Sequence, residues 1–129
     1  MKKLSGVLYL AAPYSDPDKD KRQWRYKMVT AAAAKLISKG HIVFSPITMT
    51  HPIDELLAAE GESLGSNYWI AFDLSFMKFC SEMRILQLPG WEQSRGIKRE
   101  SQIFRQQGKK ISYMSVEEVS DTYEIKGAA

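Results

Sequence analysis

Short apolar runs alternate along the chain with segments in which apolar residues recur every three or four positions. The apolar runs predict four buried strands, at residues 6–11, 41–44, 83–88 and 110–114. The periodic segments predict three longer helices, over residues 18–39, 66–79 and 94–107. Gly40 and Gly108 stand where the first and third of these helices end, as is common at helix C-termini.

The pattern is least regular between the second strand and the second helix. Ser45-Pro46 breaks the strand, and we expect a polar loop over residues 48–52 followed by a short helix over residues 54–59. Residues 61–66 are small and polar and predict a linker inside the domain. Ser66-Asn67 supplies N-cap chemistry for the helix that follows.

Strands that alternate with helices in one short chain indicate an α/β fold with a doubly wound parallel sheet. We therefore expect a single domain over residues 1–129, in which the last strand leads into a short acidic turn around Glu117. In such sheets ligands bind beyond the carboxyl ends of the strands. The segments after the first three strands hold the candidate binding residues: 13–25, 45–51 and 90–100.

Composition is that of an ordinary globular protein and narrows the range of partners. The chain has 129 residues, 44% of them hydrophobic, with 18 basic and 15 acidic side chains. The basic residues are scattered and form no stripe with interleaved aromatics, so we expect no nucleic-acid partner. The net charge of +3 fits a basic pocket for a small phosphorylated ligand, or simply solvated surface charges.

Several features favour a cytoplasmic protein without a membrane segment. No apolar run approaches the roughly 20 residues that span a bilayer. The basic start, Met1-Lys2-Lys3, precedes a run that contains Pro13 and has no small-residue cleavage site, unlike a signal peptide. A single cysteine, Cys80, cannot form an internal disulfide, and we interpret it as a small buried hydrophobe rather than a catalytic thiol.

Two carboxylates fall on helix faces that are otherwise apolar. Asp73 follows Trp69 by four residues and so shares its stripe. Glu100 comes three residues after Ile97 and four before Phe104. Buried carboxylates are unfavourable unless they are paired, and such exceptions concentrate at functional sites. The alternatives are a structural acid at Asp73, bonded to backbone amides or an arginine, and a surface glutamate at Glu100.

Two neighbours of Glu100 favour a functional role. Gly96 lies one helical turn before it, and helical side chains lean toward the N-terminus, so the carboxylate would point into space that a larger residue would fill. Glycine weakens a helix by about 1 kcal/mol relative to alanine, which otherwise makes Gly96 a poor choice. Ser94 would cap this helix and, with the free amides behind it, form an anion site; a plain N-cap without a ligand is the alternative.

Three motifs now stand out: Tyr9-Leu-Ala-Ala-Pro-Tyr14, Trp69-Ile-Ala-Phe-Asp73 and Ser94-Arg-Gly-Ile-Lys-Arg-Glu100. Together they resemble the nucleoside 2-deoxyribosyltransferase-like superfamily, over about residues 6–114. An uncharacterised bacterial branch is the most similar, because it carries segments like these three: Gly40-His-Ile-Val-Phe-Ser-Pro46, Thr50-His-Pro-Ile53 and Leu88-Pro-Gly-Trp91. The resemblance implies a Rossmann-like, flavodoxin-like domain.

The resemblance also implies a mechanism. Glu100 matches the glutamate that attacks the anomeric carbon of the sugar and forms a glycosyl-enzyme intermediate. Asp73 matches the aspartate that orients the sugar and base or transfers a proton to the leaving nitrogen. Tyr14 matches the segment that closes over the base, and Trp69 belongs to the same motif as Asp73. We therefore expect Tyr14 and Trp69 to contact the substrate.

One departure from the superfamily bears on the substrate. Its transferases have an aspartate six residues before the nucleophile, whereas this chain has Ser94, as do the nucleoside 5′-monophosphate hydrolases. In those hydrolases the serine helps to hold the phosphate, together with basic residues of the first loop. Arg22 or Arg25 could take that part here, although an exposed arginine on a long helix is the more common case.

Ser45 and His51 follow the second strand and are candidates to line the pocket. A histidine before a proline in a loop is more often a turn or capping residue. No His, Cys and Asp residues have the spacing of metal ligands, and no glycine-rich dinucleotide loop occurs. We therefore expect neither a metal nor an organic cofactor.

The resemblance, with Ser94 in place of the transferases' aspartate, implies hydrolysis of the N-glycosidic bond of a nucleoside 5′-monophosphate, with release of a free base and a sugar phosphate. A deoxyribosyltransferase, in which a second base takes the place of water, is the first alternative. A non-catalytic nucleotide-binding sensor is the second. Relatives commonly complete the pocket with a neighbour's residues, so we also expect a homodimer or a higher homo-oligomer.

Overall fold

Four parallel strands form the centre of the structure, a computed structural model that describes residues 6–120. The strands are β1 (Val7–Ala11), β2 (Ile42–Phe44), β3 (Glu82–Gln87) and β4 (Lys110–Ser115). Their order in the sheet is β2-β1-β3-β4, which is the flavodoxin-like order. The parallel α/β fold predicted from the alternation of elements is therefore confirmed. The basic start, Met1 to Lys3, lies outside the described residues.

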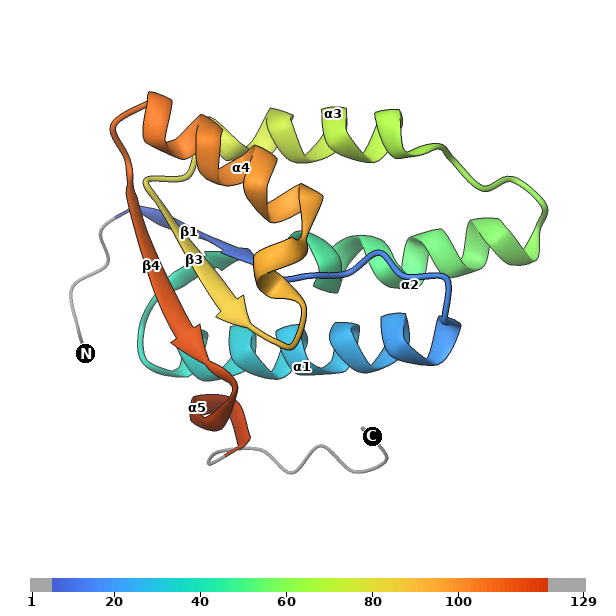
Figure 1. Cartoon of the computed structure of the whole chain (residues 1–129), viewed down its shortest axis with the longest axis horizontal. Coiled ribbons are helices and arrows are strands. Elements are labelled where there is room, and N and C mark those ends of the chain that lie inside the picture. The colour runs from blue at the N-terminus through green and yellow to red at the C-terminus, as the bar shows by residue number, and fades with distance from the viewer. Residues whose placement is uncertain (1–5, 121–129) are drawn as a thin grey trace.

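Helices cover both faces of this sheet (Figure 1). Helices α1 (Lys19–Ser38) and α5 (Val116–Ser120) cover one face, and α3 (Ser66–Met77) and α4 (Arg95–Gln106) lie over the other. Helix α2 (Pro46–Ala59) packs beside α1, and a short 3₁₀ turn, η1 (Trp91–Gln93), precedes α4. The acidic turn expected around Glu117 is thus the short helix α5, since its residues continue directly from β4.

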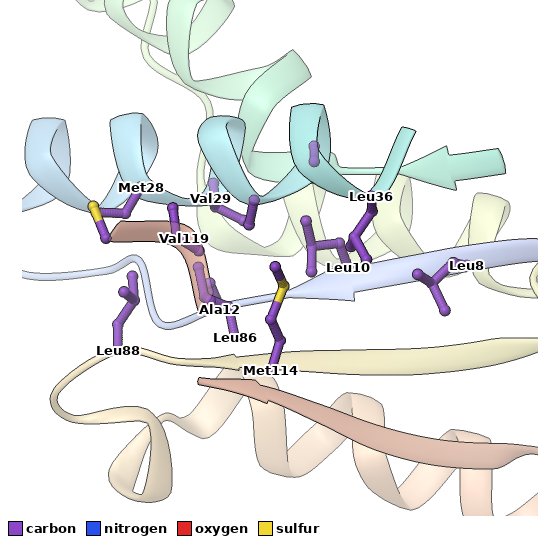
Figure 2. Close-up of a cluster of buried hydrophobic side chains, with 12 residues drawn as sticks. Leu8, Leu10, Ala12, Met28, Val29, Leu36, Leu86, Leu88, Met114 and Val119 are labelled. Carbon is purple, nitrogen blue, oxygen red and sulfur yellow. The ribbon is translucent and has the colours of Figure 1, made fainter. Parts of the chain in front are cut away.

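Aliphatic side chains fill the space between the sheet and α1 (Figure 2). Alternate residues of a strand point to opposite faces, so Leu8 and Leu10 of β1 and Leu86 of β3 all face α1. They pack against Val29 and Leu36, which α1 presents on its buried side. This face is the larger apolar core of the domain.

The opposite face carries aromatic and sulfur-containing side chains. Tyr9 is fully buried there, and it is paired in register with Phe44 of β2 and Met83 of β3. Phe104 of α4 closes over it, with 5.6 Å between the two ring centroids. Cys80 is buried in the same cluster, and burial raises the pKa of its thiol to about 11, as suits a small hydrophobe rather than a nucleophile.

The loop expected over residues 48–52 is wrong, because α2 is continuous from Pro46 to Ala59. Pro46 occupies the first turn, where no backbone N–H is needed, and the Met49 amide donates to the Ser45 carbonyl at 3.3 Å. Pro52 removes only one bond from a helix that packing against α1 supports. Packing against α1 therefore outweighs the tendency of the two prolines to break the helix.

The N-cap expected at Ser66-Asn67 is displaced by one residue. Helix α3 begins at Ser66, and Gly65 occupies the cap position without a side-chain hydrogen bond. Helix α4, in contrast, has the expected cap at Ser94. The start of α3 is therefore held less firmly than the start of α4.

Helices α2 and α3 and their linker form an arm, residues 46–77, that extends past the ends of the strands (Figure 1). Met77 is the one residue of α3 that is buried. Large apolar side chains on this arm remain exposed: Met49, Ile53, Leu56, Leu64, Tyr68, Leu74 and Phe76. In residues 6–120, no helix is both long and apolar enough to cross a membrane.

Candidate functional site

Glu100 lies on the flank of α4 that faces the sheet. Ile97, three residues earlier, and Phe104, four residues later, are both buried against the strands, which fixes the orientation of the helix. The hydroxyl of Tyr9 donates a hydrogen bond of 2.9 Å to Oε2 of Glu100. A fully buried strand residue thus holds one oxygen of a carboxylate that is itself only partly exposed.

The surroundings of Glu100 make its ionisation unfavourable. Burial raises its pKa from 4.5 to about 7, the Tyr9 hydrogen bond opposes that rise, and the charge of Asp73 adds to it. Arg99 acts in the lowering direction, but less strongly. A carboxylate in this state changes charge near neutral pH, which is the range that acid–base and nucleophilic roles require.

Asp73 lies on α3, across from Glu100, and is also partly buried. Burial raises its pKa to about 6, against a lowering effect of Arg99. The charge of Asp73 acts on Glu100, so two carboxyl groups with raised pKa values lie near each other between α3 and α4. Such a pair can hold a proton on one member while the other is ionised, an arrangement that serves bond cleavage in glycosidases.

Aromatic rings connect the outer end of α3 to Tyr9. Trp69, Phe72 and Phe76 follow one another with centroid separations of 5.7 and 5.0 Å. Phe76 stacks on Phe44 at 4.7 Å, and Phe44 contacts Tyr9 at 5.8 Å. The wall beside Asp73 is therefore apolar, which is the cause of its desolvation.

The indole Nε1 of Trp69 is buried and has no hydrogen-bond acceptor within the described residues. Trp69 stands one helical turn before Asp73, so the two side chains share a flank of α3. A buried N–H without an acceptor is unfavourable by about 1–3 kcal/mol. A ligand with an acceptor atom would remove that penalty.

The N-terminus of α4 provides donors. Oγ of Ser94 accepts the Ile97 amide at 3.2 Å, which leaves the Ser94 hydroxyl proton free to donate. The amides of Arg95 and Gly96, the first two of the helix, have no carbonyl within it to bind. A Cβ atom on Gly96 would lie 3.8 Å from Oγ of Ser94 and 3.7 Å from Nη2 of Arg99, so an alanine would fit and a longer side chain would enter the space beside them.

Arg25 is not an exposed arginine of a long helix, because only 8% of it is accessible. Its guanidinium donates to the carbonyls of Tyr14 at 3.3 Å and Ser15 at 3.2 Å, and to that of Pro89 at 3.4 Å. Its Nε is buried and has no acceptor among the described residues. Arg25 thus joins the loop after β1 to the loop after β3, and its Nε–H is available to a ligand. Arg22, in contrast, donates to the carbonyl of Asp16.

His51 lies within α2 and is 3% exposed, so it is neither a turn residue nor a residue that lines an opening. Its Nδ1 lies 2.6 Å from the hydroxyl of Tyr14 and its Nε2 lies 2.8 Å from Oε1 of Gln23. Tyr26 stacks on the imidazole, with 4.3 Å between centroids. Burial lowers the pKa of His51 and raises that of Tyr14 to about 12, so both groups stay neutral.

Ser45 directly follows Phe44, and its side chain makes no hydrogen bond to the other candidate residues within residues 6–120. Its Oγ shares a hydrogen bond of 2.7 Å with Oγ1 of Thr48, which in turn meets Oγ1 of Thr30 at 2.9 Å. This chain of hydroxyls ties α2 to α1. The structure therefore brings Glu100 and Asp73 together and gathers Tyr14, Arg25 and His51 around the first loop, while Ser45 serves the packing of two helices.

The geometry can be set beside known families. Residues 6–116 match the family described as a domain of unknown function, DUF1937. The chain belongs to the DUF1937 family. No curated protein matches it.

Three residues of this site, Tyr9, Gln23 and Tyr26, are not predicted from the sequence. Tyr9 carried a signal, since it is the one residue with a hydroxyl in the buried run of β1. Gln23 and Tyr26 carried no such signal, because a glutamine and a tyrosine are common on amphipathic helices. Only the fold places them against His51. Their role becomes visible only when α1 and α2 lie side by side.

Proposed function

We propose that this DUF1937 domain hydrolyses the N-glycosidic bond of a nucleoside 5′-monophosphate, with Glu100 as the nucleophile. The observation that carries the proposal is the pair Glu100 and Asp73, two partly buried carboxyl groups with raised pKa values on facing helices. The sequence motifs shared with the nucleoside 2-deoxyribosyltransferase-like superfamily support it. The cytoplasm is the expected location.

In the proposed first step, the one proton that the pair holds between pH values of about 6 and 7 moves from Glu100 to Asp73, a transfer that is uphill by about one pKa unit. An oxygen of the ionised Glu100 then attacks the anomeric carbon and forms an ester bond to the sugar. The bond from that carbon to the base nitrogen breaks, its electron pair stays on the nitrogen, and protonated Asp73 supplies the proton. In the second step, water attacks the same carbon, Asp73 accepts a proton from the water, and Glu100 leaves as the carboxylate. Splitting one displacement into two lowers the barrier of each.

Tyr9 prepares Glu100 for this role. Its hydrogen bond stabilises the ionised form, which the desolvated site otherwise disfavours. It also fixes the direction of the carboxylate, because the phenol is fully buried between Phe44 and Phe104. We assign Tyr9 as a residue that positions the nucleophile.

Binding of the 5′-phosphate is proposed at the N-terminus of α4. The Ser94 hydroxyl and the amides of Arg95 and Gly96 are donors, and the positive end of the helix dipole adds to them. Arg25 brings a buried positive charge to the adjoining loop, without a carboxylate within 4.0 Å among the described residues. An anion bound nearby would compensate that charge.

Aromatic side chains are proposed to hold the base. Tyr14 stands at the end of β1, held by His51 and by its backbone bond to Arg25. Trp69 offers an indole face and an N–H without an acceptor beside Asp73. Aromatic faces bind planar bases through stacking.

The proposal is tested by incubating the protein with a panel of nucleosides and their 5′-monophosphates and separating the products chromatographically. Release of free base by the wild type, its loss in Glu100→Gln and its retention in Glu92→Gln are expected, since Glu92 is an exposed carboxylate on η1. Recovery of intact nucleotide from a protein that binds it would instead indicate a sensor. Exchange of an added second base into a new nucleoside would indicate a transferase.

We also propose that the arm pairs with a second copy of the chain. Met49, Ile53 and Leu56 recur along α2 at intervals of four and three residues, so they form one stripe, and 42–64% of each is accessible. Residues 66–77 contain one charged side chain, Asp73. An apolar stripe beside a nearly uncharged helix suits an identical surface better than a charged partner, and a two-fold dimer joins like to like.

Sedimentation at micromolar concentration tests this pairing. The wild type should sediment as a dimer and the double variant Ile53→Asp with Leu56→Asp as a monomer of about 15 kDa, given the chain mass of 14.7 kDa. Ile37→Asp is the matched control, because Ile37 is 55% exposed on α1, outside the arm. A wild type that is monomeric, or a control that dissociates equally, would count against the arm.

A further inference from the structure

Helix α4 has a second flank of interest, beside the one that carries Glu100. Ile97, Ser101 and Arg105 recur every four residues and share that flank, whereas Glu100 is turned toward Tyr9 and the α3 side. Together with β3, η1 and β4 they enclose a pocket of about 220 Å³ that is open to solvent on one side. None of the groups proposed for glycoside cleavage lines it.

The pocket has an apolar floor and aromatic walls. Ile85 of β3 and Ile97 of α4 are buried beneath it. Trp91 of η1 and Tyr113 of the edge strand β4 form the walls, with ring centroids 5.8 Å apart and planes inclined at 58°. The two rings do not stack face to face, so ring surface remains available to a ligand.

Basic side chains stand at the rim. Lys98 and Arg105 are exposed and have no carboxylate within 4.0 Å among the described residues, and Glu92 is the one acid that lines the pocket. The hydroxyl of Ser101 is buried inside the pocket, and among residues 6–120 its one hydrogen bond is a weak one of 3.9 Å to Sδ of Met83. Apolar walls with a few converging donors are typical of sites for small molecules.

We infer that this pocket binds a small planar aromatic anion, with its ring against the free faces of Trp91 and Tyr113 and its acidic group between Lys98 and Arg105. Size limits the ligand, because a cavity of about 150 Å³ already holds one benzene molecule. A single ring with one carboxylate or phosphate therefore fills about 220 Å³, and a whole nucleotide does not. The inference stands independently of the proposed glycosidase activity.

Benzoate is the probe for the test, and the indole ¹H–¹⁵N signal of Trp91 is the readout. The chain has three tryptophans, so a Trp91→Phe variant assigns the signal. Benzoate should shift the Trp91 signal saturably, with a Kd of about 1–10 mM, as its few heavy atoms allow. Benzamide, which lacks the charge, and cyclohexanecarboxylate, which lacks the ring, should bind at least about tenfold more weakly.

Variants locate the site. Lys98→Gln with Arg105→Gln should weaken benzoate at least about tenfold, because both removed cations are at the rim. Lys110→Gln, an exposed cation of β4 that does not line the pocket, should leave the affinity unchanged. Glu100→Gln should also leave it unchanged.

Three results would overturn the inference. The first is equal binding of the three probes, or no saturation of the Trp91 signal. The second is loss of benzoate binding in Glu100→Gln, which would place the probe in the other site. The third is a shift of the Trp91 signal with protein concentration alone, which would make this face an interface between protein molecules.

Discussion

The two faces of the sheet differ in what they bury, although the same strands supply both. The α1 face is aliphatic, with Leu8, Leu10 and Leu86 against a helix of 20 residues. The α3 and α4 face buries the Tyr9 hydroxyl and holds two carboxyl groups with raised pKa values. The aliphatic face therefore stabilises the fold, whereas the buried polar groups of the other face lower its stability but are of the kind that catalysis needs.

The largest effect is expected on catalysis. Glu100→Gln keeps the size of the side chain and its acceptor for Tyr9 but removes the proposed nucleophile, so kcat should fall at least about 1,000-fold, which corresponds to about 4 kcal/mol of barrier. Single-turnover measurement of base release checks it. A variant that keeps more than a few per cent of the wild-type rate would remove Glu100 from the role.

On the opposite face, Leu10→Ala should act on stability. Leu10 is fully buried, so the truncation should lower the free energy of unfolding by about 3 kcal/mol. Urea denaturation measures the loss, and kcat per folded molecule should stay near the wild-type value. A fall in kcat comparable to that of Glu100→Gln would contradict the division between the faces.

Glu100 itself should destabilise the fold in a pH-dependent manner. Its pKa is about 7 in the folded state and near 4.5 when unfolded, so the folded state loses stability as pH rises from about 4.5 to 7. The free energy of unfolding should fall by about 2 kcal/mol over this range, which is less than the pKa difference alone implies because Glu100 is partly exposed to water.

Glu100→Gln should therefore be more stable than the wild type by about 2 kcal/mol at pH 8 and equal to it at pH 4. Urea denaturation at the two pH values is the measurement. Glu92→Gln, at an exposed position, should show no such difference between pH values. An equal gain for Glu100→Gln at both pH values would mean that ionisation is not the cause.

A smaller effect is expected at the helix N-terminus. Ser94→Asp keeps an N-cap residue and so preserves α4, but its charge repels a phosphate. The ratio of kcat/KM for a monophosphate to that for its nucleoside should fall at least about tenfold. A wild type that turns over both substrates equally would shift the assignment toward the transferase.

The smallest effect concerns Tyr9. Because its hydrogen bond lowers the pKa of Glu100, Tyr9→Phe should raise that pKa by less than about one unit. Because the pair must hold one proton, the rate of base release should be highest between pH values of about 6 and 7 in the wild type, and this maximum should move to higher pH in the variant. A maximum that stays in place would mean that another group controls the profile.

The sequence predicted the strands and the parallel sheet because buried strands and amphipathic helices leave periodic patterns. It also placed Asp73 and Glu100 on apolar stripes, since a charge there breaks the pattern. The second part of α2, residues 54–59, was predicted, but its first part was missed because two prolines dominate the local pattern, and only packing against α1 outweighs their effect. The contacts of His51 with Gln23 and Tyr26 join different helices, which no local pattern encodes.

The bond between Tyr9 and Glu100 joins residues 91 positions apart, which has a consequence for how the domain folds. No local segment can assemble this pair. It forms only after β1 and β3 lie side by side and α4 has returned across them, and closing so long a loop is slow because it removes much chain entropy before any contact compensates. The pair proposed for catalysis is therefore expected to assemble late in folding.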